Sequence, residues 1–187
     1  MNNESLYRDI YNKLHAKSEL RFPKEDYAYF YELLNIPQDI PQLRLLDIAC
    51  GQGFFLEAVE QRTTAIQLDG IDFSPVALSK CREKLKRTVL HESSAYELPF
   101  ADNTFDYIVN LGSLEHFEDP VSALTEVNRV LNPTGKAMII VPNRYYLGNL
   151  WTVYAYGEED DQGQEGVCNF YTIKGWERLI LKAGLDP

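Results

Sequence analysis

Cysteine is scarce in this chain, and its arrangement excludes two common uses. The 187 residues contain three cysteines, Cys50, Cys81 and Cys168, which lie far apart and are odd in number. They form no CxxC pair and no cluster with histidine, so the sequence offers neither a zinc site nor a disulfide framework. The N-terminal residues MNNESLYRD are polar and lack the apolar stretch of a secretory signal. We therefore expect a reducing, cytoplasmic environment.

Long apolar runs and clusters of basic residues are also missing. The run AMIIV, residues 137–141, is far too short to cross a bilayer. Asp and Glu outnumber Lys and Arg by 28 to 18, and the formal net charge is −10. No block of cations is present to replace the counterions of a nucleic acid. We expect neither nucleic acid nor membrane as a partner, and a small molecule is the expected ligand. The sequence leaves open whether the chain forms a homo-oligomer.

The chain does contain enough apolar sequence for one globular domain, with 45% hydrophobic and 25% charged residues. Helical spacing of apolar residues predicts two N-terminal helices, 5–20 and 24–34. The prolines of IPQDIPQ then impose an extended linker. From residue 43 onward, strands and helices alternate. The predicted strands are 43–49, 65–72, 88–91, 105–110 and 136–142, and the predicted helices are 54–62, 75–86, 121–131 and 172–182, with a turn at 132–135.

This alternation favours a doubly wound, mainly parallel, Rossmann-like α/β sheet with helices on both faces and an N-terminal helical extension. In such folds, ligands bind at the carboxyl ends of the strands, where the strand order reverses. The carboxyl end of the first predicted strand carries a pair of glycines, in the stretch LRLLDIACGQGFFLE. A ligand is therefore expected beside this pair.

The glycine pair does not match the fingerprint of a dinucleotide site. That fingerprint needs a third glycine or alanine, but Leu56 stands there, and Asp47 lies four residues before Gly51. A carboxylate repels phosphates and attracts an ammonium group, so the pattern indicates a nucleoside with a positive end and no phosphate. Asp72 ends the second predicted strand, 21 residues after Gly51, where an acid can accept the hydroxyls of a ribose.

Four ordered blocks carry a resemblance to a known family. They read LLDIACGQG, GIDFSPVAL, AYELPFADNTFDYIVNLGSLEHFEDP and ALTEVNRVLNPTGKAMIIVPN. Together they resemble the class I S-adenosylmethionine-dependent methyltransferases, in the branch that methylates small molecules and includes the ubiquinone-biosynthesis type. The resemblance runs from about residue 43 to residue 184 and implies S-adenosyl-L-methionine as cofactor. It leaves the acceptor undefined.

The resemblance also implies roles for individual residues. Asp47, Gly51 and Gly53 would line the methionine half of the cofactor, Asp72 would hold the ribose hydroxyls, and Phe73 would lie against the adenine. Family members often carry an Asp before an alanine that reaches the adenine amino group; here these positions are Ser94 and Ala95. Asn110 and Leu111 match the segment beneath the sulfonium.

The resemblance further divides the single domain, 1–187. Residues 1–36 form the N-terminal helical cap, 43–142 the cofactor-binding core, 143–171 a lid-like insertion and 172–187 the last helix. The family fold continues into a sixth and a seventh strand, which form a terminal hairpin missing from this sequence. The chain would then be truncated, a partner would supply the edge, or the sheet would end early with an exposed strand.

The insertion has two interpretations that the sequence supports equally. Its aromatic residues either wall an acceptor or pack on the core from a short helix, and its acidic run, 158–161, is then simply solvated. The aromatic residues are Tyr145, Tyr146, Trp151, Tyr154, Tyr156, Phe170 and Tyr171.

His116 is the candidate catalytic base, because it follows the fourth predicted strand and its imidazole titrates near neutral pH. Its alternative role is to brace the loop. The leading functional interpretation is a small-molecule methyltransferase that works by in-line displacement, without metal. A non-catalytic, S-adenosylmethionine-binding regulatory or interaction subunit is the alternative. A nicotinamide-dependent oxidoreductase is disfavoured by Leu56 and Asp47.

Overall fold

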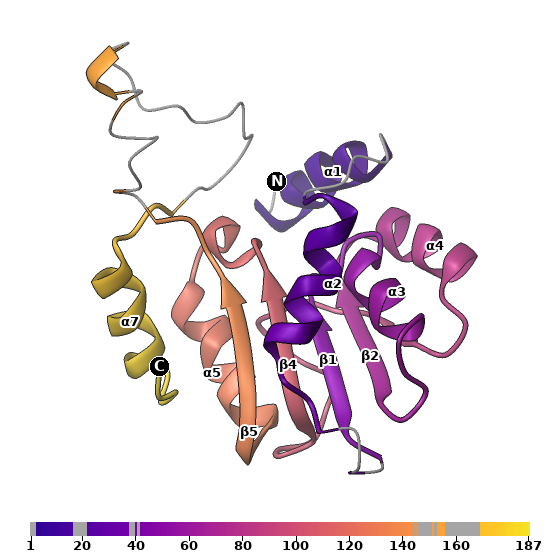
Figure 1. Ribbon diagram of the computed structural model, residues 1–187. Helices are drawn as coiled ribbons and strands as arrows, with labels where there is room; N and C mark the ends of the chain where they lie inside the picture. Colours follow the sequence, from indigo (N-terminus) through magenta and orange to yellow (C-terminus); the bar gives the residue numbers. More distant parts are fainter. Residues whose placement is uncertain are drawn as a thin grey trace.

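A parallel sheet forms the centre of the molecule (Figure 1). The computed structural model describes residues 3–16, 22–37, 40, 42–143, 145, 151, 153–155 and 169–187. Five strands pair in parallel in the order β3-β2-β1-β4-β5. Their bounds are β1 (Arg44–Ile48), β2 (Gln67–Asp72), β3 (Val89–Glu92), β4 (Phe105–Leu111) and β5 (Leu131–Ile140). The chain builds outward from β1 to β3 and then crosses to the other side of β1, so the strand order reverses between β1 and β4.

Helices cover both faces of this sheet, as the alternating pattern predicts. They are α1 (Asn3–Ala16), α2 (Lys24–Leu33), α3 (Phe54–Glu60), α4 (Pro75–Lys84), α5 (Pro120–Val130) and α7 (Ile173–Lys182), with a short 3₁₀ turn at Leu114–His116. Buried residues of α2, α3 and α4 form one core with the sheet, and those of α5 form a second core on the opposite face. The doubly wound, Rossmann-like prediction is confirmed.

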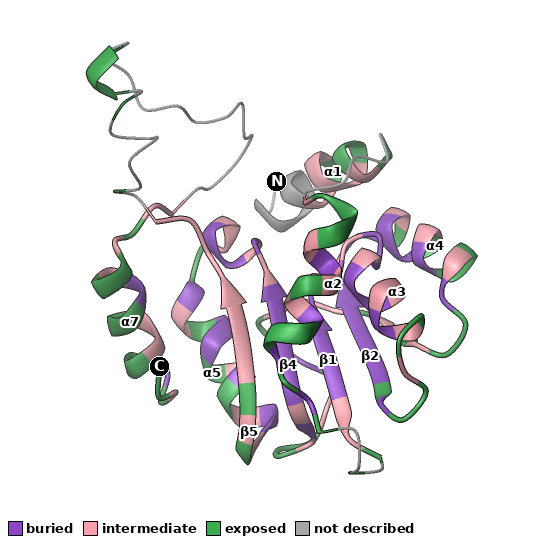
Figure 2. Cartoon of the chain, in the orientation of Figure 1, coloured by how far each residue is buried: buried purple, intermediate pink, exposed green. Residues whose placement is uncertain are grey.

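The two cores follow from the alternation of side chains along a strand. Leu45 of β1 is completely buried in the core with α3, whereas Leu46 and Ile48 lie in the core with α5. Because both faces of the central strands are covered, β1, β2 and β4 are buried along most of their length (Figure 2). This rigid centre fixes the positions of the loops at its carboxyl edge.

The observed bounds agree with the predicted elements to within a few residues, apart from one difference in β5. The described part of α1 ends at Ala16, and the last residues of the predicted helix, 17–20, lie outside the described residues, so the end of that helix stays a prediction. The predicted turn at 132–135 lies within β5, where pairing is irregular: Phe105 pairs with Leu131 and Tyr107 with Lys136. Proline at position 133 has no N–H to donate to a ladder, so these residues bulge out of it.

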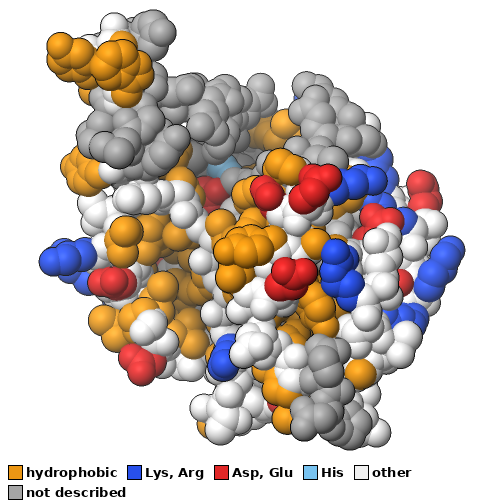
Figure 3. Space-filling model, viewed as in Figure 1, with side chains coloured by type: hydrophobic (Ala, Val, Ile, Leu, Met, Phe, Trp, Pro, Cys, Tyr) orange, Lys and Arg blue, Asp and Glu red, His pale blue; other side chains and the backbone are white. Residues whose placement is uncertain are grey.

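Among the described strands, β3 and β5 form the edges of the sheet. On the face drawn in Figure 3, hydrophobic side chains gather over α2 and around β5 and α7, while acidic and basic side chains are interspersed. Exposed apolar residues include Tyr29 and Leu33 of α2 and Ile173 and Leu181 of α7. No helix within the described residues is long and apolar enough to span a membrane.

Candidate functional site

A cavity of about 870 Å³ opens at the carboxyl ends of the central strands. Loops after β1, β2, β3 and β4 supply most of its walls, and α1 and α2 contribute side chains from above. Eight of the residues singled out from the sequence line it: Asp47, Gly51, Asp72, Phe73, Ser94, Ala95, Leu111 and His116. The other two, Gly53 and Asn110, lie behind its wall. The cavity therefore sits at the switch point, where the sequence places the ligand.

The loop after β1 needs glycine for its backbone geometry. Ala49, Gly51 and Gly53 all have positive φ, of 57°, 55° and 74°. A Cβ atom at Gly51 would lie 3.2 Å from the ring of His15, and one at Gly53 would lie 2.9 Å from the sulfur of Cys81. Gly51 thus keeps the backbone open toward the cavity, and Gly53 lets α3 begin close against α4. Strained backbone of this kind clusters at binding sites, and Ala49 also lines the cavity.

Cysteine packs beneath this loop. The Cys81 thiol donates to the Gly51 carbonyl at 3.1 Å. A hydrogen bond with Cys81 and, to a smaller extent, burial raise the pKa of Cys50 well above its usual value. Both side chains are buried. The described cysteines therefore act as neutral packing groups that support the glycine loop.

Asp72 ties the first two strand ends together. Its carboxylate accepts hydrogen bonds from the backbone N–H of Gly51 and of Ser74, each at 2.8 Å. Burial raises the pKa of Asp72, while these hydrogen bonds and the nearby His15 act in the opposite direction. Each carboxylate oxygen has a second lone-pair site, so Asp72 can also accept the hydroxyls of a ribose.

Asp47 is a second buried carboxylate that faces the cavity. Only 3% of this residue is exposed, and burial, together with the charge of Asp72, raises its pKa well above the usual value. Two buried acids near each other are costly unless a cation joins them. The two acceptors therefore fit a ligand with a positive group beside a nucleoside, a combination that S-adenosylmethionine presents.

The side chain of Asn110 braces the site without reaching the cavity. Its amide donates to the Ile48 carbonyl and accepts from the N–H of Leu114, both at 3.0 Å. These bonds join the end of β1 to the turn that carries His116. Leu111, the next residue, lines the cavity instead.

His116 lies in the cavity wall and is largely buried, with 9% of its side chain exposed. Its Nε2 is 3.7 Å from a carboxylate oxygen of the buried Glu115, and its ring packs edge-on to Tyr11 with 6.3 Å between centroids. This environment is compatible with both a base and a brace.

The first helix supplies wall residues that sequence reasoning missed. Tyr11 packs edge-on to Phe73 at 5.3 Å, and His15 lies over Gly51 with its pKa lowered, chiefly by burial. Lys80 donates to the carbonyls of His15 and Ala16, which anchors the end of α1 on α4. The signal was present in part, since Tyr11 and His15 are four apart and share one helix face. Nothing in the sequence reveals where that face docks.

The lid-like insertion is only partly described. Tyr145, Trp151 and Tyr154 are 59%, 65% and 83% exposed and do not line the cavity. Tyr171 packs on Trp176 of α7, with 4.9 Å between ring centroids. Tyr146, Tyr156, Cys168 and the acidic run 158–161 lie outside the described residues, so the lid interpretation stays a prediction.

Comparison with known proteins supplies the family. Residues 46–139 match the family model described as a methyltransferase domain. A demethylmenaquinone methyltransferase of Bacillus cereus is 31% identical over 213 residues, covering 98% of this chain and 88% of that protein. A chloroplastic 2-methyl-6-phytyl-1,4-hydroquinone methyltransferase of Oryza sativa is 34% identical over 127 residues, covering 63% of this chain. That match spans 36% of the rice protein's own length.

Solved structures agree on the fold. A chain of the complex between the Haloferax volcanii Trm112 methyltransferase activator and the putative methyltransferase superposes with a TM-score of 0.73 at 18% identity, covering 94% of this chain and 76% of that one. At this identity the likeness concerns architecture alone. The domain match and the Bacillus relative show that the chain belongs to the methyltransferase-domain family, within class I of the S-adenosylmethionine-dependent methyltransferases.

Proposed function

We propose that this protein transfers a methyl group from S-adenosylmethionine to a small aromatic acceptor of the quinol type. The observation that carries the proposal is the pair of buried carboxylates, Asp47 and Asp72, on either side of an open glycine loop at the switch point. The names of two relatives support the acceptor class, since the Bacillus cereus protein is named for demethylmenaquinone and the rice protein for a hydroquinone.

Different residues of the cavity would bind different parts of the cofactor. Asp47 and the backbone at Gly51 would hold the ammonium end, Asp72 the ribose hydroxyls, and Phe73 with the segment at Ser94 and Ala95 the base. S-adenosylmethionine, when bound, supplies a methyl group on a positively charged sulfur. The protein's task is to align the acceptor for an in-line displacement and to keep water out.

Aromatic side chains in the cavity wall would suit an aromatic acceptor. Tyr11 and Phe117 line the cavity, and the ring of Phe117 packs edge to face on that of Tyr96 at 5.8 Å. Such faces bury a flat apolar ring favourably. His116 lies in the same wall, where a ring nitrogen could take the proton of an acceptor hydroxyl.

Two measurements test this function. Calorimetric titration with S-adenosylmethionine, S-adenosylhomocysteine and NAD should show binding of the first two only. Mass spectrometry should then detect methylation of demethylmenaquinol or of 2-methyl-6-phytyl-1,4-hydroquinone. Cofactor binding without turnover on any quinol would favour the alternative, a non-catalytic binding subunit, and binding of NAD alone would overturn the proposal.

A further inference from the structure

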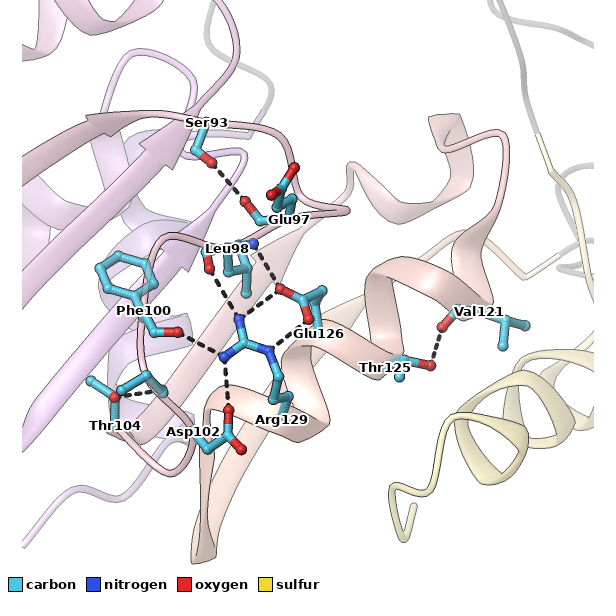
Figure 4. Close-up of polar contacts among 11 residues, drawn as sticks. Ser93, Glu97, Leu98, Phe100, Asp102, Thr104, Val121, Thr125, Glu126 and Arg129 are labelled. Carbon is cyan, nitrogen blue, oxygen red and sulfur yellow. Dashed lines mark hydrogen bonds and ion pairs between the residues drawn. The ribbon is translucent and has the colours of Figure 1, made fainter.

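Arg129, in the last turn of α5, makes a dense set of polar contacts. Its guanidinium donates to both carboxylate oxygens of Glu126 at 2.7 Å each, one turn earlier on α5. It also donates to the carbonyls of Leu98 and Phe100, at 3.0 and 2.7 Å, and to the carboxylate of Asp102 at 3.0 Å (Figure 4). Bidentate, charge-assisted pairs of this kind have a fixed geometry.

Glu126 also bonds to the backbone of Leu98, as an acceptor where Arg129 is a donor. The same carboxylate accepts the backbone N–H of Leu98 at 2.7 Å, so both polar groups of the Leu98 backbone are bonded to side chains of α5. The side chains of Glu126 and Arg129 are 18% and 30% exposed. The bonds to Arg129 lower the pKa of Glu126, which keeps its carboxylate charged.

Glu126 and Arg129, here called the clamp, hold one end of the segment to which the proposed function assigns the base of the cofactor. Residues 93–97 line the cavity, and Leu98 follows them directly. Their other end is fixed to the sheet, where Glu92 of β3 pairs with Asp72 and the N–H of Ser93 donates to the Asp72 carbonyl at 3.2 Å. Between these anchors, the segment is held by local bonds, such as that from the Ser93 hydroxyl to the Glu97 carbonyl at 2.9 Å.

We propose that Arg129 and Glu126 are positioning residues that hold the segment 93–97 in register with the nucleoside, and that they thereby set which base the cavity accepts. The proposal rests on the proposed use of S-adenosylmethionine. Neither side chain lines the cavity, so the pair acts through the segment and not by contact with the ligand.

The segment can discriminate between bases because it offers backbone groups at fixed positions. A hydrogen-bonded edge tells an exocyclic amino group from a carbonyl only if its own donors and acceptors are held in place, since a mobile loop can rearrange to suit either. Loosening the clamp should therefore reduce the preference of the cavity for adenine over other bases, with little effect on the stability of the fold.

The experiment compares S-adenosylhomocysteine with its inosine analogue, in which a carbonyl replaces the adenine amino group. In the wild type, calorimetry should give at least about tenfold tighter binding of the adenine form. In Arg129→Met and in the milder Glu126→Gln, the ratio of the two affinities should fall toward one. Asp102→Ala, which removes one contact of a side chain that is 70% exposed, and Thr125→Ala, which lies outside the clamp, should keep the wild-type ratio.

Hydrogen exchange on the ligand-free protein gives an independent readout. The amides of Tyr96, Glu97 and Leu98 are bonded within the segment or to Glu126, so they should exchange faster in Arg129→Met and in Glu126→Gln than in both controls. Unchanged exchange of these amides, or an unchanged affinity ratio in folded Glu126→Gln, would overturn the positioning role. Failure of the wild type to bind either nucleoside would instead overturn the proposed function, and the exchange rates would still decide whether the pair holds the segment.

Discussion

The charge of Asp47 depends on what occupies the cavity. Burial and the neighbouring Asp72 raise the pKa of Asp47 well above its usual value, whereas a bound ammonium group would favour the ionised carboxylate. Binding of S-adenosylhomocysteine should therefore release up to about one proton, and its affinity should rise with pH through the raised pKa. Calorimetry in two buffers with different heats of ionisation measures the proton release directly.

The raised pKa of Asp47 has the opposite effect on the stability of the ligand-free protein: rising pH strengthens ligand binding but weakens folding. A carboxyl whose pKa is higher in the folded than in the unfolded state favours folding at low pH, and that contribution is lost as pH rises through the folded-state pKa. The variant Asp47→Asn should remove both the proton release and this pH dependence. Equal proton release in the wild type and in Asp47→Asn would place the titrating group elsewhere.

His116 has two roles to be separated. If it takes a proton from the acceptor, His116→Ala should lower kcat by roughly 10²–10⁴-fold and leave the affinity for S-adenosylhomocysteine nearly unchanged. If the residue only braces the loop, the variant should lose stability and keep its kcat. A kcat close to the wild-type value with a phenolic acceptor would remove His116 from the chemistry.

Among single residues, those at strand ends could be predicted from their spacing along the chain. Asp47 and Asp72 could be predicted because a strand end and a glycine loop determine where an acid points. Tyr11 and His15 could not, since their contacts depend on how α1 docks across the sheet. For Gly53 and Asn110, a role toward the ligand stays a prediction: a Cβ atom at Gly53 would meet Cys81 and Leu85, and both groups of the Asn110 side-chain amide bond to backbone.

Among the elements, α1 is held by polar contacts from α4, from the N-cap residue of α4 and from the loop after β1. Lys80 donates to two carbonyls at the end of α1, the Ser74 hydroxyl donates to the Asn12 side chain at 2.6 Å, and Gln52 donates to the His15 carbonyl at 3.1 Å. The last-turn carbonyls of a helix have no partners within it, so losing Lys80 removes a donor from each of two of them, and the His15 carbonyl keeps only the bond from Gln52. Lys80→Met should therefore loosen α1 with little effect on the sheet.

Hydrogen exchange should show faster exchange over residues 8–16 in Lys80→Met and unchanged exchange in β1 and β4. Arg82→Met is the matched control, because Arg82 is an exposed base on the same helix. Since α1 walls the cavity, the affinity for S-adenosylhomocysteine should fall in Lys80→Met and not in Arg82→Met. Equal exchange of α1 in the two variants would mean that Lys80 does not hold the helix.

Element bounds were predictable where capping residues mark them. Ser74 accepts the N–H of Ala77 at the start of α4, and Thr172 accepts that of Gly175 at the start of α7, as polar N-caps do. The irregular start of β5 was not predictable, because Asn132-Pro133-Thr134-Gly135 has the composition of a turn. Only its pairing with β4 decides that these residues belong to a bulged strand.

For the whole molecule, the pattern of strands and helices predicted the doubly wound sheet, since parallel strands need long crossover connections, which are usually helical. The same rule brought the carboxyl ends of β1, β2 and β4 to one edge, so the ligand could be placed before any contact was known. How α1 closes that edge could not be derived, because nothing local in a sequence encodes the docking of a terminal helix.

A ligand at the switch point should therefore stabilise the entire domain, because its walls come from both halves of the sheet and from α1. S-adenosylhomocysteine at a hundredfold excess over its Kd should add about 2.7 kcal/mol to the free energy of unfolding. For a chain of 187 residues, this corresponds to a rise in Tm of about 5–10 °C. Differential scanning calorimetry measures it, with NAD as the ligand control. Asp72→Asn should need more S-adenosylhomocysteine for the same rise, because the amide cannot accept at both positions. A Tm that stays constant in the wild type up to the solubility limit of the ligand would contradict binding at this site.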